Sequence, residues 1–547
     1  MIDVHNWYAV LPENVQRGIL VGAEGSVQLM SFAQQTLQAA QTAGPKQKEL
    51  LQAGVYFLLA AWSKDPLNGQ LAEQLLTLHT KWPCLDPATC ALLESVQSKW
   101  VNPPDTRYYR RLLEAEDSEK LQLFLGDQLT RSPENFYWWR QSMAFAQYEE
   151  DWELANKVMQ SSDWPAHLKP VHQTLLGDIA WLQGDKEQAC QYYTEAYGLD
   201  ALFRRALHLS QTQGLDAARP LWQKLLTVAP WMSLAVLVCY DLLQGYPARS
   251  APVPGKGVVA VYSYNKAADL DITLSSLLDS QLGHAELWVL NNGSTDATAD
   301  VLAGWQERAG EQMRRIDLPV NIGAPAARNW LMYEALQAGK DWMAYVDDDV
   351  ELPENWLHML GAAMEIYPDA GVWGCKVVDA VHPVSMQSVD LHLRPASEGG
   401  PDERFDLADI HHQTLDFGQF NYIRPCSSVT GCCHLFRMKT LAECGDFDLR
   451  FSPSQFDDLE HDIRLNIQGR YAVYQGHLRI LHLKRTGKGT RGNSAQFSSA
   501  IANMHKLQKK YSASQYAKLI DWEADVLAKD FWKKHTLVMQ WLWEENT

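Results

Sequence analysis

Residues 342–349 read WMAYVDDD, an apolar run that ends at three consecutive aspartates. A continuous apolar run of this length is typical of a buried strand. Three adjacent carboxylates repel one another unless a cation lies among them, and an all-oxygen group suits Mg²⁺ or Mn²⁺. Taken alone, an acidic triplet is more often a solvated loop or a helix cap than a metal site. The flanking sequence has to distinguish these interpretations.

Strands and helices alternate along the sequence before this run. β-rich runs lie at 258–263 and 287–290, and helical patterns lie at 269–278, 295–308 and 324–338. Such alternation predicts a largely parallel sheet with helices on both faces. Ligands of such sheets collect at the carboxyl ends of the strands. The sequence therefore predicts a binding site formed by whatever follows each strand.

Polar clusters follow the predicted strands and open the third predicted helix. They are Ser263-Tyr264-Asn265, Asn291-Asn292-Gly293-Ser294-Thr295-Asp296, Asn321-Ile322-Gly323, Ala327-Arg328-Asn329 and Asp347-Asp348-Asp349. Beyond them come TGCCHLFRMKTLAECGDFD (430–448), FDDLEHDIRLNIQG (456–469) and ILH, which ends at residue 482.

This ordered set resembles the family 2 glycosyltransferases of GT-A fold, and the resemblance covers roughly residues 256–485. It implies an α/β GT-A domain, Rossmann-like and with a mostly parallel sheet. The implied activity is inverting transfer of a sugar from a nucleotide-sugar donor. The elements in this order are together far more specific than any one of them.

The resemblance also implies a metal site. Asp347 and Asp349 match the family's metal motif, and His482 stands where the family often supplies a further ligand. The implied cofactor is Mn²⁺ or Mg²⁺, bridging the diphosphate and stabilising the departing nucleoside diphosphate. Considered alone, a histidine such as His482 is more often a hydrogen-bonded core residue.

The resemblance places the donor nucleotide against residues from several of these clusters. Near the base it implies Ser263, Tyr264, Asn265, Asn291 and Asn292, and near the ribose and phosphates Arg328, Asp347 and Asp348. A basic, glycine-containing run from Lys484 to Gly489 follows His482. Lys484 is therefore a further candidate contact of the diphosphate, although such a run is also typical of a flexible exit from a domain.

The Asp457-Asp458 pair matches the family's Glu-Asp pair, in which the second carboxylate takes the proton of the acceptor hydroxyl. The resemblance thus makes Asp458 the general base, with Asp457 beside it. Carboxylates in the first turn of a helix are also favoured by the helix dipole alone, so this pair has a purely structural interpretation as well.

Two positions depart from the family pattern. Asn291 and Asn292 stand where two aspartates are usual. An amide oxygen can accept a hydrogen bond from uracil N3–H, so a UDP-sugar remains the expected donor, but the amide's donor group could favour another base. Asp457 replaces a glutamate and shortens the reach of that carboxylate.

Residues 1–245 carry helix-period patterning. Ala155 and Ala189 are 34 residues apart, and GDKEQACQYYTEAYGLD (184–200) resembles the second half of a tetratricopeptide repeat. We therefore expect a helical region over 1–100 and tetratricopeptide-like repeats over 101–245. Such an array presents a concave surface to a partner. The alternative, less favoured, is that the helices are only a spacer or a dimerisation face.

The remaining boundaries follow from composition. The Pro/Gly-rich segment GYPARSAPVPGKG predicts a linker over 246–257, followed by the transferase domain over 258–489 and packed helices over 490–547. Four histidines lie in the stretch 379–425, namely His382, His392, His411 and His412. A second metal site there is conceivable, but a mobile acceptor-binding lid is the preferred interpretation.

Composition limits the partners. The net charge is −18, which disfavours nucleic acid. No stretch is long and apolar enough to span a bilayer and the first residues do not resemble a signal peptide, so we expect a soluble, cytoplasmic protein. The nine cysteines lack disulfide-scaffold density and zinc spacing, which favours reduced thiols.

The sequence thus predicts a metal-dependent inverting glycosyltransferase of hexosyl- or N-acetylhexosaminyltransferase type. The repeats favour a protein acceptor, of the flagellin or surface-protein class. One alternative is a transferase for a lipid-linked or cell-envelope glycan. Another is an inactive scaffold that only binds a nucleotide sugar or a partner.

Overall fold

The structure is a computed structural model that describes residues 4–160, 164–396, 403–483 and 494–544. It divides into two compact units. The first comprises Met1–Cys239, Gln413–Gly418 and Leu537–Thr547, and the second comprises Tyr240–His412 and Gln419–Thr536. In the described part of the chain, no helix has the length and apolarity needed to cross a membrane.

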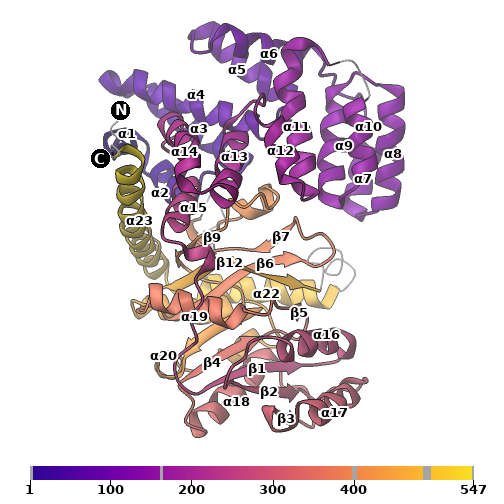
Figure 1. Ribbon diagram of the computed structural model, residues 1–547, viewed down its shortest axis with the longest axis vertical. Coiled ribbons are helices and arrows are strands. Elements are labelled where there is room, and N and C mark those ends of the chain that lie inside the picture. The colour runs from indigo at the N-terminus through magenta and orange to yellow at the C-terminus, as the bar shows by residue number, and fades with distance from the viewer. Residues whose placement is uncertain (1–3, 161–163, 397–402, 484–493, 545–547) are drawn as a thin grey trace. The chain divides into compact units, whose positions relative to one another are not determined.

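The first unit is helical, as predicted (Figure 1). Many of its helices begin at a side chain that caps the free backbone N–H groups: Asn68 accepts from Leu71 N, and Asp86 accepts from Ala88 N and Thr89 N. The helices are α1 (Val4–Val10), α2 (Glu13–Val21), α3 (Ser26–Ala40), α4 (Gln47–Ser63), α5 (Gly69–Lys81), α6 (Pro87–Ser98), α7 (Arg107–Ala115), α8 (Ser118–Arg131), α9 (Phe136–Glu149), α10 (Trp152–Gln160), α11 (Lys169–Leu182), α12 (Lys186–Tyr192), α13 (Leu199–Thr212), α14 (Leu215–Val228) and α15 (Ser233–Leu243).

Small residues let neighbouring helices of this unit approach closely. A Cβ added at Gly177 of α11 would lie 2.4 Å from the ring of Tyr193, just after α12, so only glycine fits there. Ala155 and Ala189 are fully buried at the positions from which the 34-residue period was inferred. Paired helices packed through small residues are what a helical repeat requires. The assignment to tetratricopeptide repeats stays a prediction.

The second unit is built on a mixed sheet in the order β10-β12-β6-β11-β4-β1-β2-β3 (Figure 1). Strands β4, β1, β2 and β3 are parallel, whereas β11 pairs antiparallel with both β4 and β6. The strands are β1 (Gly257–Ser263), β2 (Glu286–Asn291), β3 (Met313–Asp317), β4 (Trp342–Val346), β5 (Val350–Glu351), β6 (Val372–Asp379), β7 (Met386–Ser388), β8 (Leu393–Pro395), β9 (Phe405–Leu407), β10 (Ile423–Cys426), β11 (Cys433–Arg437) and β12 (Ala472–His482). The predicted fold class, helices followed by an α/β domain, is confirmed.

The helices of the second unit agree with the predicted alternation. They are α16 (Ala267–Leu278), α17 (Thr298–Ala309), α18 (Ala324–Gln337), α19 (Trp356–Ile366), α20 (Met438–Cys444), α21 (Asp457–Ile467), α22 (Ser494–Lys510) and α23 (Ala513–Trp543), the last of which continues into the first unit. Strand β3 was not predicted. It lies at the end of the sheet path, where Arg314 and Arg315 remain solvent-accessible, so it lacks the apolar run of a central strand.

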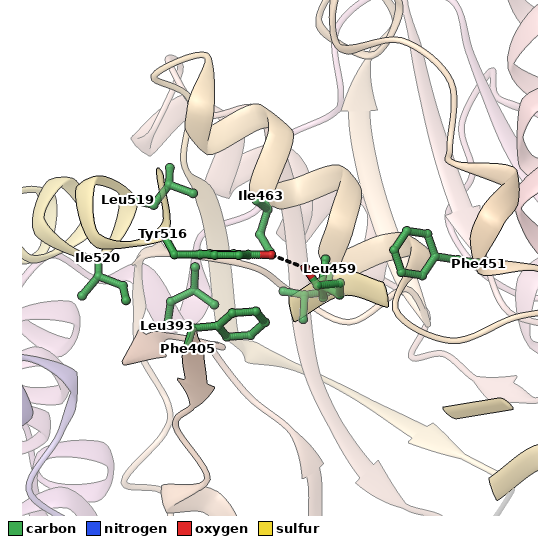
Figure 2. Close-up of a cluster of buried hydrophobic side chains, with 9 residues drawn as sticks. Leu393, Phe405, Phe451, Leu459, Ile463, Tyr516, Leu519 and Ile520 are labelled. Atoms are coloured by element: carbon green, nitrogen blue, oxygen red, sulfur yellow. Dashed lines mark hydrogen bonds between the residues drawn. The ribbon is translucent and has the colours of Figure 1, made fainter. Parts of the chain in front are cut away.

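An apolar cluster fixes α21 in place (Figure 2). Leu459 and Ile463 project from α21 into it and pack against side chains of the two C-terminal helices and of β8 and β9. Tyr516, fully buried at its centre, donates a hydrogen bond to the carbonyl of Leu507 at 2.5 Å. The helix that carries Asp457 and Asp458 is thereby anchored on its opposite side.

The stretch 379–425 contains β7, β8, β9 and part of β10, so its described part belongs to the folded unit. His392 is buried between two carboxylates, with 2.9 Å from Nε2 to Asp390 and 2.7 Å from Nδ1 to Glu523 of α23. A histidine held between two acids in this way joins β8 to the C-terminal helix.

Candidate functional site

Strand register gathers the predicted polar clusters at one edge of the sheet. Ser263, the last residue of β1, is level with Asn291 of β2, which is level with Asp317 of β3. On the other side, Val261 is level with Val346, the residue before Asp347. The carboxyl ends of the parallel strands therefore meet there, as an open α/β sheet requires of a ligand site.

The turn after β1 and the loop after β2 are joined by hydrogen bonds. Asn265 adopts a positive φ of 55°, its backbone N–H donates to Ser294 Oγ at 3.1 Å, and its side-chain oxygen accepts from Thr295 N at 2.7 Å. Tyr264, the residue before Asn265 in this turn, has 43% of its surface exposed. The turn thus offers an aromatic side chain at the strand ends, where a base could stack.

The two asparagines that replace the family's aspartates are engaged within the protein. Asn291 Nδ2 donates to Asp317 at 2.9 Å and its Oδ1 accepts from Ser294 N at 3.0 Å. Asn292 Nδ2 donates to Asn321 and its Oδ1 accepts from Ile322 N, both at 3.0 Å. Both side chains are buried, so their first role in the structure is to shape the loops around the strand ends.

The three aspartates after β4 lie in three different environments. Asp347 contacts Tyr262 OH at 3.3 Å and Arg328 at 3.9 Å, with 26% of its side chain exposed. Asp348 and Asp349 are nearly buried and both accept from the ammonium group of Lys266, at 3.0 and 2.5 Å. A cation therefore does lie among the carboxylates, and it comes from the turn after β1.

His482, at the end of β12, reaches the same acidic turn. Its Nε2 is 3.3 Å from Asp349 Oδ1, and its Nδ1 is 2.5 Å from Gln387 Oε1. Burial acts to raise the pKa of Asp349, but the hydrogen bond from His482 and the charge of Lys266 hold that pKa well below its usual range. Asp349 is therefore an anion with its histidine already oriented by a neighbouring amide.

The donor chemistry of these residues fits a hard divalent cation, because carboxylate oxygens and one imidazole nitrogen lie at the turn. Within the described ranges, however, no three histidine, cysteine, aspartate or glutamate side chains are grouped closely enough to hold a metal ion. Lys266 is in contact with the two carboxylates instead. Asp349 and His482 are brought together, while Asp347 faces Tyr262 and Arg328.

The Asp457-Asp458 pair divides into two roles. Asp457 is buried and forms an ion pair with Arg328 at 2.7 Å. Asp458 is half-buried, and its carboxylate accepts from the backbone N–H groups of Gly431 and Leu459, each at 2.8 Å. Arg328 lies between Asp457 and Asp347, so it connects the pair to the acidic turn.

Gly431 permits this arrangement. A Cβ added there would lie 2.5 Å from Arg328 Nη2 and 2.9 Å from Asp458 Oδ2. Sequence reasoning missed Gly431, Lys266 and Tyr262 as members of the site. The glycine lies in the TGCC stretch and the lysine directly follows Tyr264-Asn265, but no spacing rule connects either to the aspartates. Lys484 lies outside the described residues.

The pKa of Asp347 predicts a pH-dependent effect of its replacement. Burial and the neighbouring carboxylates raise this pKa from 3.8 to about 6. The folded protein then binds this proton more tightly than the unfolded chain does. The stability that protonated Asp347 contributes to the wild type is therefore lost as the pH rises through about 6. In chelator, Asp347→Asn should gain up to about 3 kcal/mol of relative stability between pH 4 and pH 8. Thermal unfolding measures this gain, and a difference independent of pH would contradict it.

Comparison with known proteins assigns part of the second unit. Residues 258–445 match the family model described as "Glycosyl transferase family 2". No curated protein matches the chain.

Two solved structures are similar at low identity. One is GalNAc-T7 with UDP, GalNAc and Mn²⁺, with 13% identity, 52% of this chain and 57% of that chain covered, and a TM-score of 0.34. The other is the mannosyltransferase PcManGT from Pyrobaculum calidifontis in complex with GDP-Man and Mn²⁺, with 16% identity, 59% and 85% covered, and a TM-score of 0.35. The chain thus spans little more than half of the first structure's length.

Proposed function

Because residues 258–445 form a glycosyltransferase family 2 domain, we propose that the protein is a metal-dependent inverting glycosyltransferase with Asp458 as its general base. The observation that carries the proposal is the convergence, through Arg328, of the Asp457-Asp458 pair and the acidic turn Asp347–Asp349 at one edge of the sheet. One cluster could thus serve the donor and the other the acceptor.

The geometry supports a division of labour among the residues. The turn at Tyr264-Asn265 and the loop from Asn291 would hold the base, since both lie at the carboxyl ends of β1 and β2. Asp347, Asp349 and His482 would hold Mn²⁺ or Mg²⁺, which when bound supplies positive charge against the diphosphate. Arg328 and Asp348 would lie beside the ribose and phosphates, each already held by an ion pair.

Asp458 has the properties of the proposed base. The backbone N–H groups of Gly431 and Leu459 orient its carboxylate by hydrogen bonds, and neither group gives up its proton to it. In the proposed step the acceptor hydroxyl oxygen attacks the anomeric carbon, its proton moves to Asp458, and the bond from the anomeric carbon to the diphosphate breaks. One displacement inverts the configuration and requires no covalent enzyme intermediate.

The helical unit favours a protein acceptor. Helices α3 and α5 line a groove of about 1190 Å³ within the first unit, and α8 and α10 line a second of about 820 Å³. Concave helical surfaces are suited to protein partners, which supports transfer to a protein of the flagellin or surface type. A lipid-linked or cell-envelope glycan is the second candidate acceptor. It is favoured by tryptophans near the end of α23, such as Trp543, which is 44% exposed, because exposed tryptophans are suited to contact with a membrane surface.

The proposal is tested by ligand-induced stabilisation. UDP, GDP, CDP, ADP and their sugars are added with Mn²⁺, Mg²⁺ or chelator, since a ligand of the native state raises the melting temperature. We expect a metal-dependent shift for a uridine nucleotide, followed by detection of sugar transfer by mass spectrometry. No shift with any nucleotide would overturn the proposal and leave a scaffold. A shift without transfer to protein, but with transfer to lipid-linked glycan, would favour the second candidate.

Gly431 provides a separate prediction. Gly431→Ala should lower sugar transfer at least tenfold, because the new methyl group displaces Arg328 or Asp458. The matched control is Gly304→Ala on α17, where an added Cβ meets no atom within 4 Å. Initial rates at saturating donor measure both. Equal rates for the two variants would show that the close approach at Gly431 is not required for catalysis.

A further inference from the structure

Lys266 is the residue that sequence reasoning did not use and that the geometry places at the centre of the acidic turn. Its Nζ lies 3.0 Å from Asp348 Oδ1 and 2.5 Å from Asp349 Oδ2. Both carboxylates are nearly buried, with 9% and 3% of their side chains exposed. Two buried anions with one ammonium group between them are where a divalent cation would otherwise be needed.

We propose that Lys266 is the resident counter-ion of this turn, and that a divalent cation enters by displacing its ammonium group from Asp349. The inference rests on the proposed metal-dependent function. It concerns the metal-free protein, in which the lysine makes the acidic turn stable, and the loading step, in which the lysine competes with the metal.

The side chain of Lys266 can move away from the acidic turn. It extends from the N-cap position of α16, at the turn after β1, and 32% of it is exposed. A lysine has a flexible four-carbon stem and a compact charge, so it can move its ammonium group into solvent at low cost. Arg328, the other cation of the site, differs in both respects: it is 4% exposed and its guanidinium pairs with buried Asp457.

The acidic turn also holds a carboxylate and an imidazole side by side next to the lysine. Asp349 presents Oδ2 to Lys266 and Oδ1 to His482 Nε2, so the two oxygens face opposite partners. Gln387 fixes the other imidazole nitrogen. Removal of the ammonium group therefore frees one carboxylate oxygen beside an oriented imidazole, without rearrangement of the strands.

Displacement has a consequence for the donor. The released ammonium group stays tethered at the carboxyl end of β1, where the diphosphate of a nucleotide would lie. A diphosphate gives it a new anionic partner, so metal and nucleotide should bind cooperatively. By linkage, each should raise the affinity of the other by the same factor.

The test titrates Mn²⁺ alone into the full-length protein, by calorimetry and by loss of the free-ion EPR signal. Lys266→Met should bind Mn²⁺ about tenfold more tightly than wild type, and the gain should vanish in Lys266→Met/Asp349→Asn. Lys266→Arg keeps the charge and should bind no more tightly than wild type. The matched control, Lys340→Met, removes a lysine that pairs with Glu286 elsewhere on the sheet and should leave the affinity unchanged. Equal or weaker Mn²⁺ binding by Lys266→Met would overturn the inference.

A second measurement uses wild-type protein and does not depend on the folding of a variant. Reductive methylation with mass-spectrometric readout should label Lys266 several-fold faster with Mn²⁺ than with chelator, while Lys340 is unchanged. Unchanged or slower labelling of Lys266 would overturn the displacement. Neither readout requires nucleotide or sugar transfer. Failure of the proposed function would instead appear as absence of nucleotide binding.

Discussion

Asp458→Asn should abolish sugar transfer while donor binding persists. The carboxylate of Asp458 is half-buried and aimed by the N–H groups of Gly431 and Leu459, and the proposed mechanism assigns it the proton of the acceptor hydroxyl. An amide of the same shape cannot take that proton. Loss of a general base lowers the rate by about 10²–10⁴-fold. We therefore expect kcat to fall by that factor and the nucleotide-sugar Kd to change less than about threefold.

The controls separate loss of the base from loss of structure. Asp369→Asn replaces an exposed aspartate of the same unit and should transfer at the wild-type rate. Donor binding by calorimetry and far-UV circular dichroism confirm that Asp458→Asn is folded. If Asp458→Asn turned over at the wild-type rate, the base would have to be another residue. If it lost donor binding as well, Asp458 would belong to the donor site.

The class of fold could be predicted because the central strands have a recognisable sequence pattern. The runs at β1, β2 and β4 are apolar and end in polar clusters, so they indicated both the sheet and the edge that carries the site. Strand β3 escaped prediction because Arg314 and Arg315 give it the composition of a solvated segment. The antiparallel pairing of β11 with β4 and β6 has no local pattern, since it is decided by tertiary packing.

The members of the site were predictable as residues and not as contacts. Asp349 and His482 were paired through family resemblance, and the structure places them 3.3 Å apart. The partnership of Lys266 with Asp348 and Asp349 joins positions more than 80 residues apart in sequence. No periodicity or spacing encodes such a contact. The same holds for the buried pair of Arg328 with Asp457.

The buried pair leads to the largest expected effect on stability. Arg328→Met should lower the free energy of unfolding of the second unit by about 3–5 kcal/mol, because it leaves Asp457 buried without a partner. Burial already raises the pKa of Asp457. Without Arg328, Asp457 can become neutral by binding a proton. The loss should therefore be smaller at pH 5 than at pH 8.

A double-mutant cycle isolates this pair from the rest of the site. Arg328→Met leaves the charge of Asp457 without a partner, and Asp457→Asn removes that charge. The double variant should therefore lose less free energy of unfolding than the sum of the two single losses. Urea-dependent hydrogen exchange of β1 and β4 reports the second unit separately from the helical unit. Additive losses would show that Asp457 does not depend on Arg328 for its charge. A coupling of about 2 kcal/mol or more would show that this ion pair, lying between the acidic turn and Asp458, holds the two halves of the site together.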